Sequence, residues 1–360
     1  MATDLKIQNA REALKEWAGK AARPVTLMEV CGTHTMAIYR HGIPSLLPPN
    51  VHLISGPGCP VCVTSQGQVD QIMELARYPE VTIATFGDMV RVPGTISSLE
   101  AERARGADVR IVYSPHDAVE LAEAIPARQV VFIGIGFETT QPTVAAAVAE
   151  ARRRELRNFT VLSAGKLVPP ALTALLDSGE LQLDGLLCPG HVSVILGSDA
   201  YKPYAERYHM PCVVAGFEPA EVLEALVALV RQCAERRAKV ENLYGTWVRP
   251  EGNRRAREMI ETVFVPGPAI WRGLGPIPQS GLHVREGWSE YDAARRFAVV
   301  EGEAPEPPGC KCGDVLRGRV RPYECPLFGR ICSPEHPVGA CMVSTEGSCS
   351  AAYRYGRIPK

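Results

Sequence analysis

The sequence predicts an α/β protein with parallel sheets in two Rossmann-like lobes, followed by a separate cysteine-rich C-terminal domain. Two observations predict this. Apolar, β-branched runs recur between residues 51 and 215, with starts 21 to 30 residues apart and helical patterns between them. The segment 301–360 holds 6 of the 12 cysteines together with 8 Pro and 8 Gly, a composition that disfavours helices and central strands. The first pattern is the βαβ rhythm of parallel sheets covered by helices.

The elements follow in order along the chain. The segment from Asp4 to Lys20 is predicted to form a helix that packs against the rest of the protein, with Gly19 as its stop signal. An apolar run from Val25 to Val30 follows it. Seven further runs are the predicted strands: Val51 to Ser55, Val81 to Phe86, Val109 to Tyr113, Val130 to Ile135, Thr160 to Ser163, Leu183 to Leu187 and Cys212 to Ala215. A Ser-Pro-x-Asp start at Ser114 signals one of the intervening helices.

Seven strands could form either one sheet or two lobes, and a short sequence that occurs twice favours two lobes. Gly-Phe-Glu follows a strand and opens a helix both at Gly136 and at Gly216. A long helix is expected from Glu218 to about Leu243. We therefore divide the chain into two α/β lobes over 1–245, a mixed connecting region over 246–300 and a cysteine-rich domain over 301–360, which opens with a Pro/Glu-rich linker over 301–309.

Composition excludes several function classes. Lys and Arg number 39 against 40 Asp and Glu, which argues against nucleic-acid binding through bulk charge. No apolar stretch reaches the roughly 18 residues of a membrane span, and residues 1–20 lack the apolar core of a signal peptide. We expect a cytoplasmic protein. Twelve cysteines in a reducing compartment predict metal binding or thiol chemistry rather than a disulfide framework.

Three polar loops follow predicted strands, where ligands gather in doubly wound sheets. They are residues 56–62, 134–140 and 188–191, and their convergence on one crevice is a hypothesis. The first contains Cys59 and Cys62 as a C-x-x-C that enters a helix, a spacing that permits a disulfide and a setting that favours thiolate. Half of a zinc site is the alternative, but no second close pair is near in sequence.

Cys31 and His34 follow the run that ends at Val30. A thiol and an imidazole together can act as nucleophile and base or bind a soft metal, whereas an inert buried cysteine is the plain alternative. Glu138 lies in a loop that resembles a dinucleotide fingerprint but has Thr139 at the third glycine position, which argues against NAD. Glu138 is a candidate base or anchor, or an ordinary helix-start carboxylate, and His191 is a candidate site histidine or a plain loop residue.

The C-terminal cysteines have the irregular spacing of iron-sulfur ligands rather than the paired C-x-x-C spacing of a zinc ribbon. Four thiolates suffice for a cluster, so two of the six are surplus. Cys325, Cys332 and Cys349 are preferred as ligands over Cys341, and the choice between Cys310 and Cys312 is open.

Taken together, these motifs resemble the HypD family of NiFe-hydrogenase maturation proteins over nearly the whole chain. The sequences that carry the resemblance are CGTH at Cys31, GPGCPVC at Gly56, GFETTQPT at Gly136, CPGHVSVILG at Cys188, and CGDVLRG, CPLFGRICSP and PVGACMVSTEGSC in the cysteine-rich C-terminal domain. Several of these motifs are long and unusual, which makes chance agreement a poor explanation.

The resemblance implies a scaffold on which iron acquires its cyanide and carbonyl ligands, forming the Fe(CN)2CO unit for the hydrogenase large subunit. It implies a 4Fe-4S cluster in the C-terminal domain, a small HypC-type chaperone and a HypE-type cyanide donor as partners. By this similarity Cys31 holds the iron with a cysteine of the HypC-type partner, Cys59 and Cys62 exchange electrons beside it, and His34 handles protons or supports the metal. It implies neither a nucleic-acid nor a membrane partner.

Two other readings stay open at this point. One is a self-contained iron-sulfur enzyme that reduces or forms a protein disulfide, with no iron cyanide passing through it. The other is a binding protein whose C-terminal cysteines hold zinc.

Overall fold

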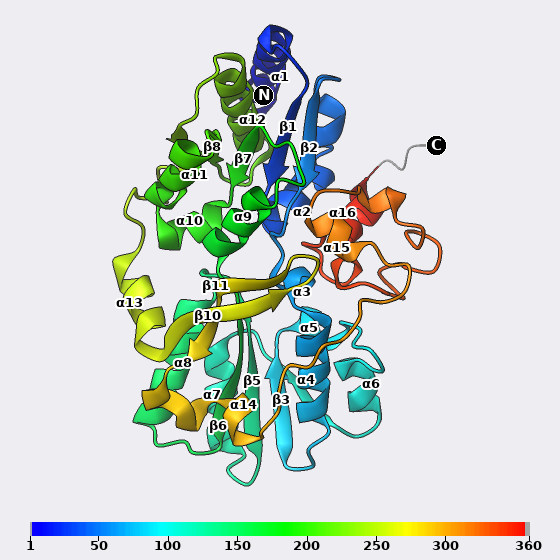
Figure 1. The fold of residues 1–360 in the computed structure, drawn as a ribbon. Helices are drawn as coiled ribbons and strands as arrows, with labels where there is room; N and C mark the ends of the chain where they lie inside the picture. Colours follow the sequence, from blue (N-terminus) through cyan, green and yellow to red (C-terminus); the bar gives the residue numbers. More distant parts are fainter. Residues whose placement is uncertain (1, 357–360) are drawn as a thin grey trace.

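The computed structural model describes residues 2–356, and it confirms an α/β protein with parallel sheets (Figure 1). Among these residues a five-stranded parallel sheet has the order β2-β1-β7-β8-β9, and a four-stranded parallel sheet has the order β4-β3-β5-β6. A two-stranded antiparallel hairpin completes the set. The strands are β1 (Val25–Glu29), β2 (Val51–Ser55), β3 (Val81–Thr85), β4 (Asp108–Ile111), β5 (Gln129–Gly136), β6 (Phe159–Gly165), β7 (Gly185–Cys188), β8 (Cys212–Val214), β9 (Val240–Asn242), β10 (Phe264–Trp271) and β11 (Gly275–Val284).

The chain enters the five-stranded sheet twice. β1 and β2 build one edge, the chain then forms the whole four-stranded sheet, and it returns to add β7, β8 and β9. Figure 1 shows the two sheets one above the other, with the β10–β11 hairpin crossing between them. The loops that follow β1, β2, β7 and β8 therefore share the carboxyl edge of one sheet, which is where a doubly wound sheet presents its ligands.

Helices cover the sheets and connect the strands. They are α1 (Ala2–Lys20), α2 (Gly32–Arg40), α3 (Pro60–Val63), α4 (Gln66–Ala76), α5 (Gly87–Val90), α6 (Leu99–Ala104), α7 (Pro115–Ala124), α8 (Gln141–Arg153), α9 (Val168–Asp177), α10 (Gly190–Leu196), α11 (Lys202–Arg207), α12 (Pro219–Ala234), α13 (Arg254–Val263), α14 (Ala293–Arg296), α15 (Cys312–Leu316) and α16 (Ser348–Tyr355). Short 3-10 turns complete the structure: η1 (Ile43–Leu46), η2 (Ser198–Tyr201), η3 (Glu286–Tyr291), η4 (Pro322–Glu324) and η5 (Ala340–Met342).

The helix expected from Glu218 to Leu243 was too long. α12 ends at Ala234, and residues 240–242 form β9, which pairs with β8. The end is a Schellman motif, in which the N–H of Arg237 bonds to the carbonyl of Gln232 and the N–H of Arg236 bonds to that of Cys233. Arg236 takes the left-handed conformation (φ 52°) that glycine normally supplies, so no glycine marks the stop in the sequence.

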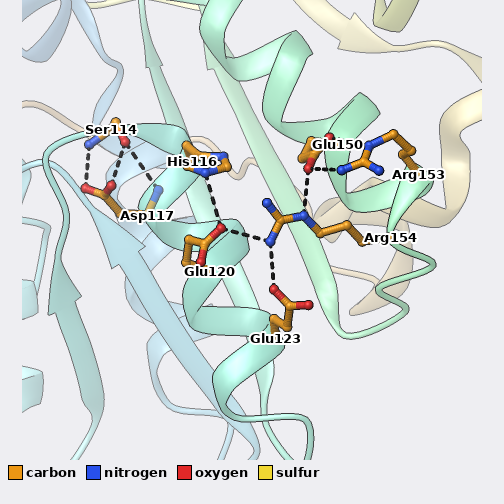
Figure 2. A network of polar contacts seen from close by, with 8 residues as sticks. All are labelled: Ser114, His116, Asp117, Glu120, Glu123, Glu150, Arg153 and Arg154. Carbon is orange, nitrogen blue, oxygen red and sulfur yellow. Dashed lines mark hydrogen bonds and ion pairs between the residues drawn. The ribbon is translucent and has the colours of Figure 1, made fainter.

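The outer face of the four-stranded sheet carries a polar network between α7 and α8 (Figure 2). The predicted Ser114 start is confirmed, because Ser114 and Asp117 form a capping box. Arg154, just after α8, bonds to Glu120 and Glu123 of α7 and to Glu150 of its own helix. These exposed pairs tie two helices together and contribute little individually to stability.

The C-terminal region packs against the five-stranded sheet beside α2 and α3, as Figure 1 shows in orange and red. Residues 301–309 contain no helix or strand, and Glu301 accepts a hydrogen bond from Ser65 at the start of α4. Within residues 2–356, no helix combines the length and apolarity needed to cross a bilayer.

Candidate functional site

Cys31 lies where β1 ends and α2 begins, and its side chain is buried. Its backbone N–H donates to Glu29 Oε2 at 3.0 Å, and the backbone N–H groups of Thr33 and His34 at the start of α2 act to lower the pKa of its thiol. Burial nevertheless raises the pKa of the Cys31 thiol to about 12 and that of the Glu29 carboxyl to about 7. The thiol is thus held at a helix start but stays protonated until a metal ion or another group displaces the proton.

The loop that carries Cys59 lies directly against the loop that carries Cys31. The Gly32 N–H donates to the Gly58 carbonyl at 2.7 Å. A Cβ atom at Gly58 would lie 2.2 Å from the Cys31 nitrogen, so this approach requires glycine. Glycine in the GPGCPVC motif therefore serves to bring the two thiol loops together.

Cys59 and Cys62 form a disulfide, with Cα atoms 5.2 Å apart. Cys59 caps the short helix α3, and its sulfur accepts the N–H of Cys62 at 3.2 Å. Both side chains are buried. The two cysteines thus have the geometry that a two-electron thiol-disulfide pair requires.

The His34 ring contacts the loop that follows β8. Its Nε2 lies 2.8 Å from the Gly216 carbonyl, which can only accept, so Nε2 carries the proton. Nδ1 is buried and has no partner among the described residues. Burial lowers the pKa of His34 to about 4, which keeps the ring neutral at pH 7.

His191 is more exposed and lies at the start of α10 after β7. The Phe217 ring lies between the two histidines, with centroids 4.8 Å from His34 and 4.1 Å from His191. Burial also lowers the pKa of His191. The two histidines therefore reach the same edge of the sheet as Cys31, but they are joined through an aromatic ring rather than to the thiols.

Glu138 belongs to the other sheet, after β5. It is 2% exposed, its Oε1 accepts the Val168 N–H at 2.9 Å, and its Oε2 has no partner among the described residues. Burial raises the pKa of this carboxyl to about 7. No described hydrogen bond joins Glu138 to either thiol loop, although the neighbouring Phe137 stacks on Trp271, which pairs with Thr64 just beyond α3.

The six C-terminal cysteines gather in one region, and five of them are buried. Cys341 Sγ lies 3.1 Å from Cys349 Sγ, and the Cys312 thiol is close enough to influence the pKa of Cys341. A Cβ atom at Gly339 would lie 2.6 Å from Cys310 Sγ. Within residues 2–356, no three or more Cys, His, Asp or Glu side chains surround one point at metal-binding distances.

The C-terminal region also reaches the N-terminal thiols. Thr33, two residues after Cys31, donates to Glu346 Oε1 at 2.6 Å. The disulfide shares one continuous hydrophobic core with Cys312, Cys341 and Cys349. Segments from opposite ends of the chain therefore form one cysteine-rich centre.

Comparison with known proteins identifies the family to which this chain belongs. The HypD model, described as "Hydrogenase formation hypA family", matches residues 6–356. The chain belongs to the HypD family. The hydrogenase expression/formation protein HupD of Azotobacter chroococcum mcd 1 is 49% identical over 358 residues, which cover 97% of this chain and 94% of that protein.

Two hydrogenase maturation factors named HypD are also similar to this chain. That of Azotobacter vinelandii is 50% identical over 93% of this chain and 90% of its own length, and that of Escherichia coli K12 is 46% identical over 97% and 94%. The predicted HypD resemblance is thereby confirmed, and this HypD-family chain is a hydrogenase maturation factor.

Several side chains at the candidate site were not among the residues predicted from the sequence. Glu29 and Glu346 contact the Cys31 loop, and Phe217 separates the histidines. Arg272, buried at the hairpin tip, donates to the Thr64 carbonyl and to Gln66 just after the disulfide. A carboxylate inside the apolar run before Cys31 was a visible signal for Glu29. Arg272 and Glu346 had none, because their partners lie in a distant part of the sequence.

Proposed function

We propose that this protein is the scaffold on which the Fe(CN)2CO unit of the NiFe-hydrogenase active site is assembled. The observation that carries the proposal is the contact between the two thiol loops, where Gly58 meets Cys31 and places a potential iron ligand beside a disulfide pair. A thiolate is a suitable soft donor for iron(II) bearing cyanide and carbon monoxide. In this proposal iron is cargo, held by Cys31 and by a cysteine of a HypC-type chaperone.

Cys59 and Cys62 supply electrons for cyanide transfer. Release of cyanide from a thiocyanate on the HypE-type partner breaks a C–S bond and consumes two electrons. The dithiol of Cys59 and Cys62 provides both on closing its S–S bond, and its two protons pass to the carrier thiolate and to the released cyanide, which gives up its proton on binding iron. The oxidised pair in the structure corresponds to the state after such a transfer.

A neutral His34 can accept a proton during this transfer. Its Nε2 is committed to Gly216, so its unpartnered Nδ1 is a buried acceptor beside the thiol loops. His191 and Glu138 lie at the carboxyl edges of the two sheets, and we assign them supporting roles beside the thiol loops. The raised pKa of Glu138 lets that carboxyl hold or give up a proton near neutral pH.

The C-terminal cysteines fit a 4Fe-4S cluster. Cys310, Cys325 and Cys332 lie outside the helices, whereas Cys312, Cys341 and Cys349 lie in short helical segments. Gly339 leaves open the space beside Cys310 that a side chain would fill. Cys325, Cys332 and Cys349 with Cys310 or Cys312 would hold the cluster, and Cys341 joins the group through its contacts with Cys312 and Cys349. A bound cluster would supply single electrons, in two steps, for reduction of the Cys59–Cys62 disulfide.

The alternative is a stand-alone iron-sulfur thiol-disulfide oxidoreductase, favoured by the same disulfide beside the same cysteine region. Both functions need the C-x-x-C pair, but only the scaffold needs Cys31 as an iron ligand. Cys31 therefore discriminates between them.

The test is the infrared spectrum of the protein isolated anaerobically with a HypC-type partner. We expect bands of cyanide and carbonyl bound to iron, and we expect Cys31→Ala to abolish them while the visible spectrum of the cluster persists. Cys188→Ala, which removes a buried thiol that bonds only within the core, is the control. Bands that survive in Cys31→Ala, or their absence from the unmodified complex, would contradict the scaffold proposal.

A further inference from the structure

A groove of about 490 Å³ runs beside β2, between the five-stranded sheet and the C-terminal region. All five residues of β2 line it. Residues between 315 and 323, together with Tyr355 and Gly356, also line it. The groove is separate from the thiol loops, which lie beyond the carboxyl end of the same strand.

β2 is an edge strand with free hydrogen-bonding groups on its groove side. It pairs only with β1, in parallel register, and the Val25 N–H bonds to the Asn50 carbonyl while the Gly56 N–H bonds to that of Glu29. Because the direction of the backbone hydrogen bonds alternates along a strand, the N–H and C=O groups of His52 and Ile54 point toward β1. The backbone groups of Leu53 therefore point away from the sheet, and no described residue pairs with them.

The groove is lined mainly by apolar side chains, together with Ser45, His52, Ser55 and several tyrosines, and it holds one cation among the described residues. Pro44, Pro48 and Val320 contribute to its walls, and Arg321 is its single permanently charged lining residue. The Arg321 Nη1 donates to the Tyr323 hydroxyl at 2.7 Å, which holds the guanidinium over the groove lining. An open strand edge, walls that are mostly apolar and one cation fit an extended, mostly apolar segment with a carboxylate.

We propose that the β2 edge binds an extended, apolar segment of a partner protein as an added strand, with a carboxylate of that segment meeting Arg321. The Leu53 N–H and C=O supply the backbone pairing, and alternate side chains of the segment enter the groove. The carboxylate sets the register. This inference does not depend on the iron chemistry, because the groove shares no residue with the thiol loops.

The probe is a library of short random peptides displayed on phage, panned on the full-length protein and followed by synthesis of the enriched peptides. We expect enrichment of alternating apolar sequences that contain one Asp or Glu. In hydrogen exchange, the enriched peptide should protect the amide of Leu53. The amides of His52 and Ile54, already bonded to β1, should change little.

Three variants test the mode of binding. Leu53→Pro removes the outward N–H without disturbing the ladder to β1, and it should weaken peptide binding by about tenfold or more. Leu53→Ala removes the same side chain but keeps the N–H, so it should bind within a few fold of the unmodified protein. Ile111→Pro, at the equivalent outward position of the edge strand β4, controls for the proline itself.

Arg321→Gln should weaken the acidic peptide several-fold and leave its Asn or Gln analogue unchanged. Equal binding to Leu53→Pro and Leu53→Ala would overturn strand addition, and equal loss of both peptides in Arg321→Gln would overturn the carboxylate contact. Failure of the library to yield a peptide sensitive to Leu53→Pro would overturn the site. A concentration-dependent dimer that Leu53→Pro abolishes would replace the partner segment by a second copy of the chain.

Discussion

The two parallel sheets carry the same Gly-Phe-Glu sequence at equivalent places, after β8 and at the end of β5, yet the two copies differ in what they contact. Phe217 lies between two imidazoles, whereas Phe137 stacks on Trp271 with centroids 5.9 Å apart. Glu218 is exposed and caps α12, whereas Glu138 is buried with an unpartnered oxygen. Sheet topology places a motif at a carboxyl edge, but its neighbours decide its chemistry.

The same contrast holds for the loops around these motifs. The five-stranded sheet presents Cys31 and the Cys59–Cys62 pair beside its copy, and the C-terminal region covers them. The four-stranded sheet presents a carboxyl and no thiol. Redox and metal chemistry are therefore assigned to the first sheet and proton chemistry to the second, a division that the following changes test.

The largest effect is expected from the disulfide pair. Cys59→Ala and Cys62→Ala should each abolish hydrogenase maturation, because a single thiol cannot release two electrons by closing a disulfide. Hydrogenase activity of a host strain measures this. The melting temperature should stay near that of Cys233→Ala, which changes a half-buried thiol far from the site. Normal maturation in both variants would remove the redox role.

The two phenylalanines should respond differently. Phe137→Ala removes a fully packed ring and should lower the free energy of unfolding by about 4 kcal/mol. Phe217→Ala should lower it by roughly 1 kcal/mol, the contribution of an aromatic contact at a half-buried position. It should also raise the pKa of His191 toward its ordinary value, because the ring that buries it is gone; NMR titration measures this. Equal losses of stability would contradict the contrast between the copies.

Glu138 should make stability depend on pH. Burial raises its pKa from 4.5 to about 7, so its stabilising contribution is present below pH 4.5 and is lost as the pH rises through 7. Relative to Glu138→Gln, the unmodified protein should lose about 3 kcal/mol over this range, measured by urea unfolding. Glu218→Gln is the matched control, because that side chain has the same place in the repeated motif but is exposed. A constant difference for Glu138→Gln would refute the buried carboxyl.

The smallest effect tests the contact between the thiol loops. Gly58→Ala places a methyl group against the Cys31 backbone and should destabilise the protein by about 2 kcal/mol. Gly19→Ala, in the exposed end of α1 with no atom within 4 Å, should be neutral or slightly stabilising. Thermal unfolding of the two variants provides the comparison. A Gly58→Ala protein as stable as Gly19→Ala would mean that the loops do not approach closely.

Local patterns predicted much of this arrangement. The apolar runs located β1 to β8, and the Ser114 start was correct to the residue because a capping box is a local interaction. β9 was missed because Arg236, not glycine, ends α12. The β10–β11 hairpin was missed because its strands contain four prolines, tolerated where backbone N–H groups need no ladder partner.

By itself the sequence determined the α/β class, the strand positions, the thiol motifs and membership of the HypD family, because periodicity and motif spacing are properties of neighbouring residues. Only the tertiary structure decided that the five-stranded sheet combines β1 and β2 with β7, β8 and β9, which lie much later in the chain. It also decided that His34 bonds to Gly216 and that Glu346 reaches the Cys31 loop. The open edge of β2 is equally a tertiary fact. These features depend on contacts between residues far apart in the chain, which no local pattern encodes.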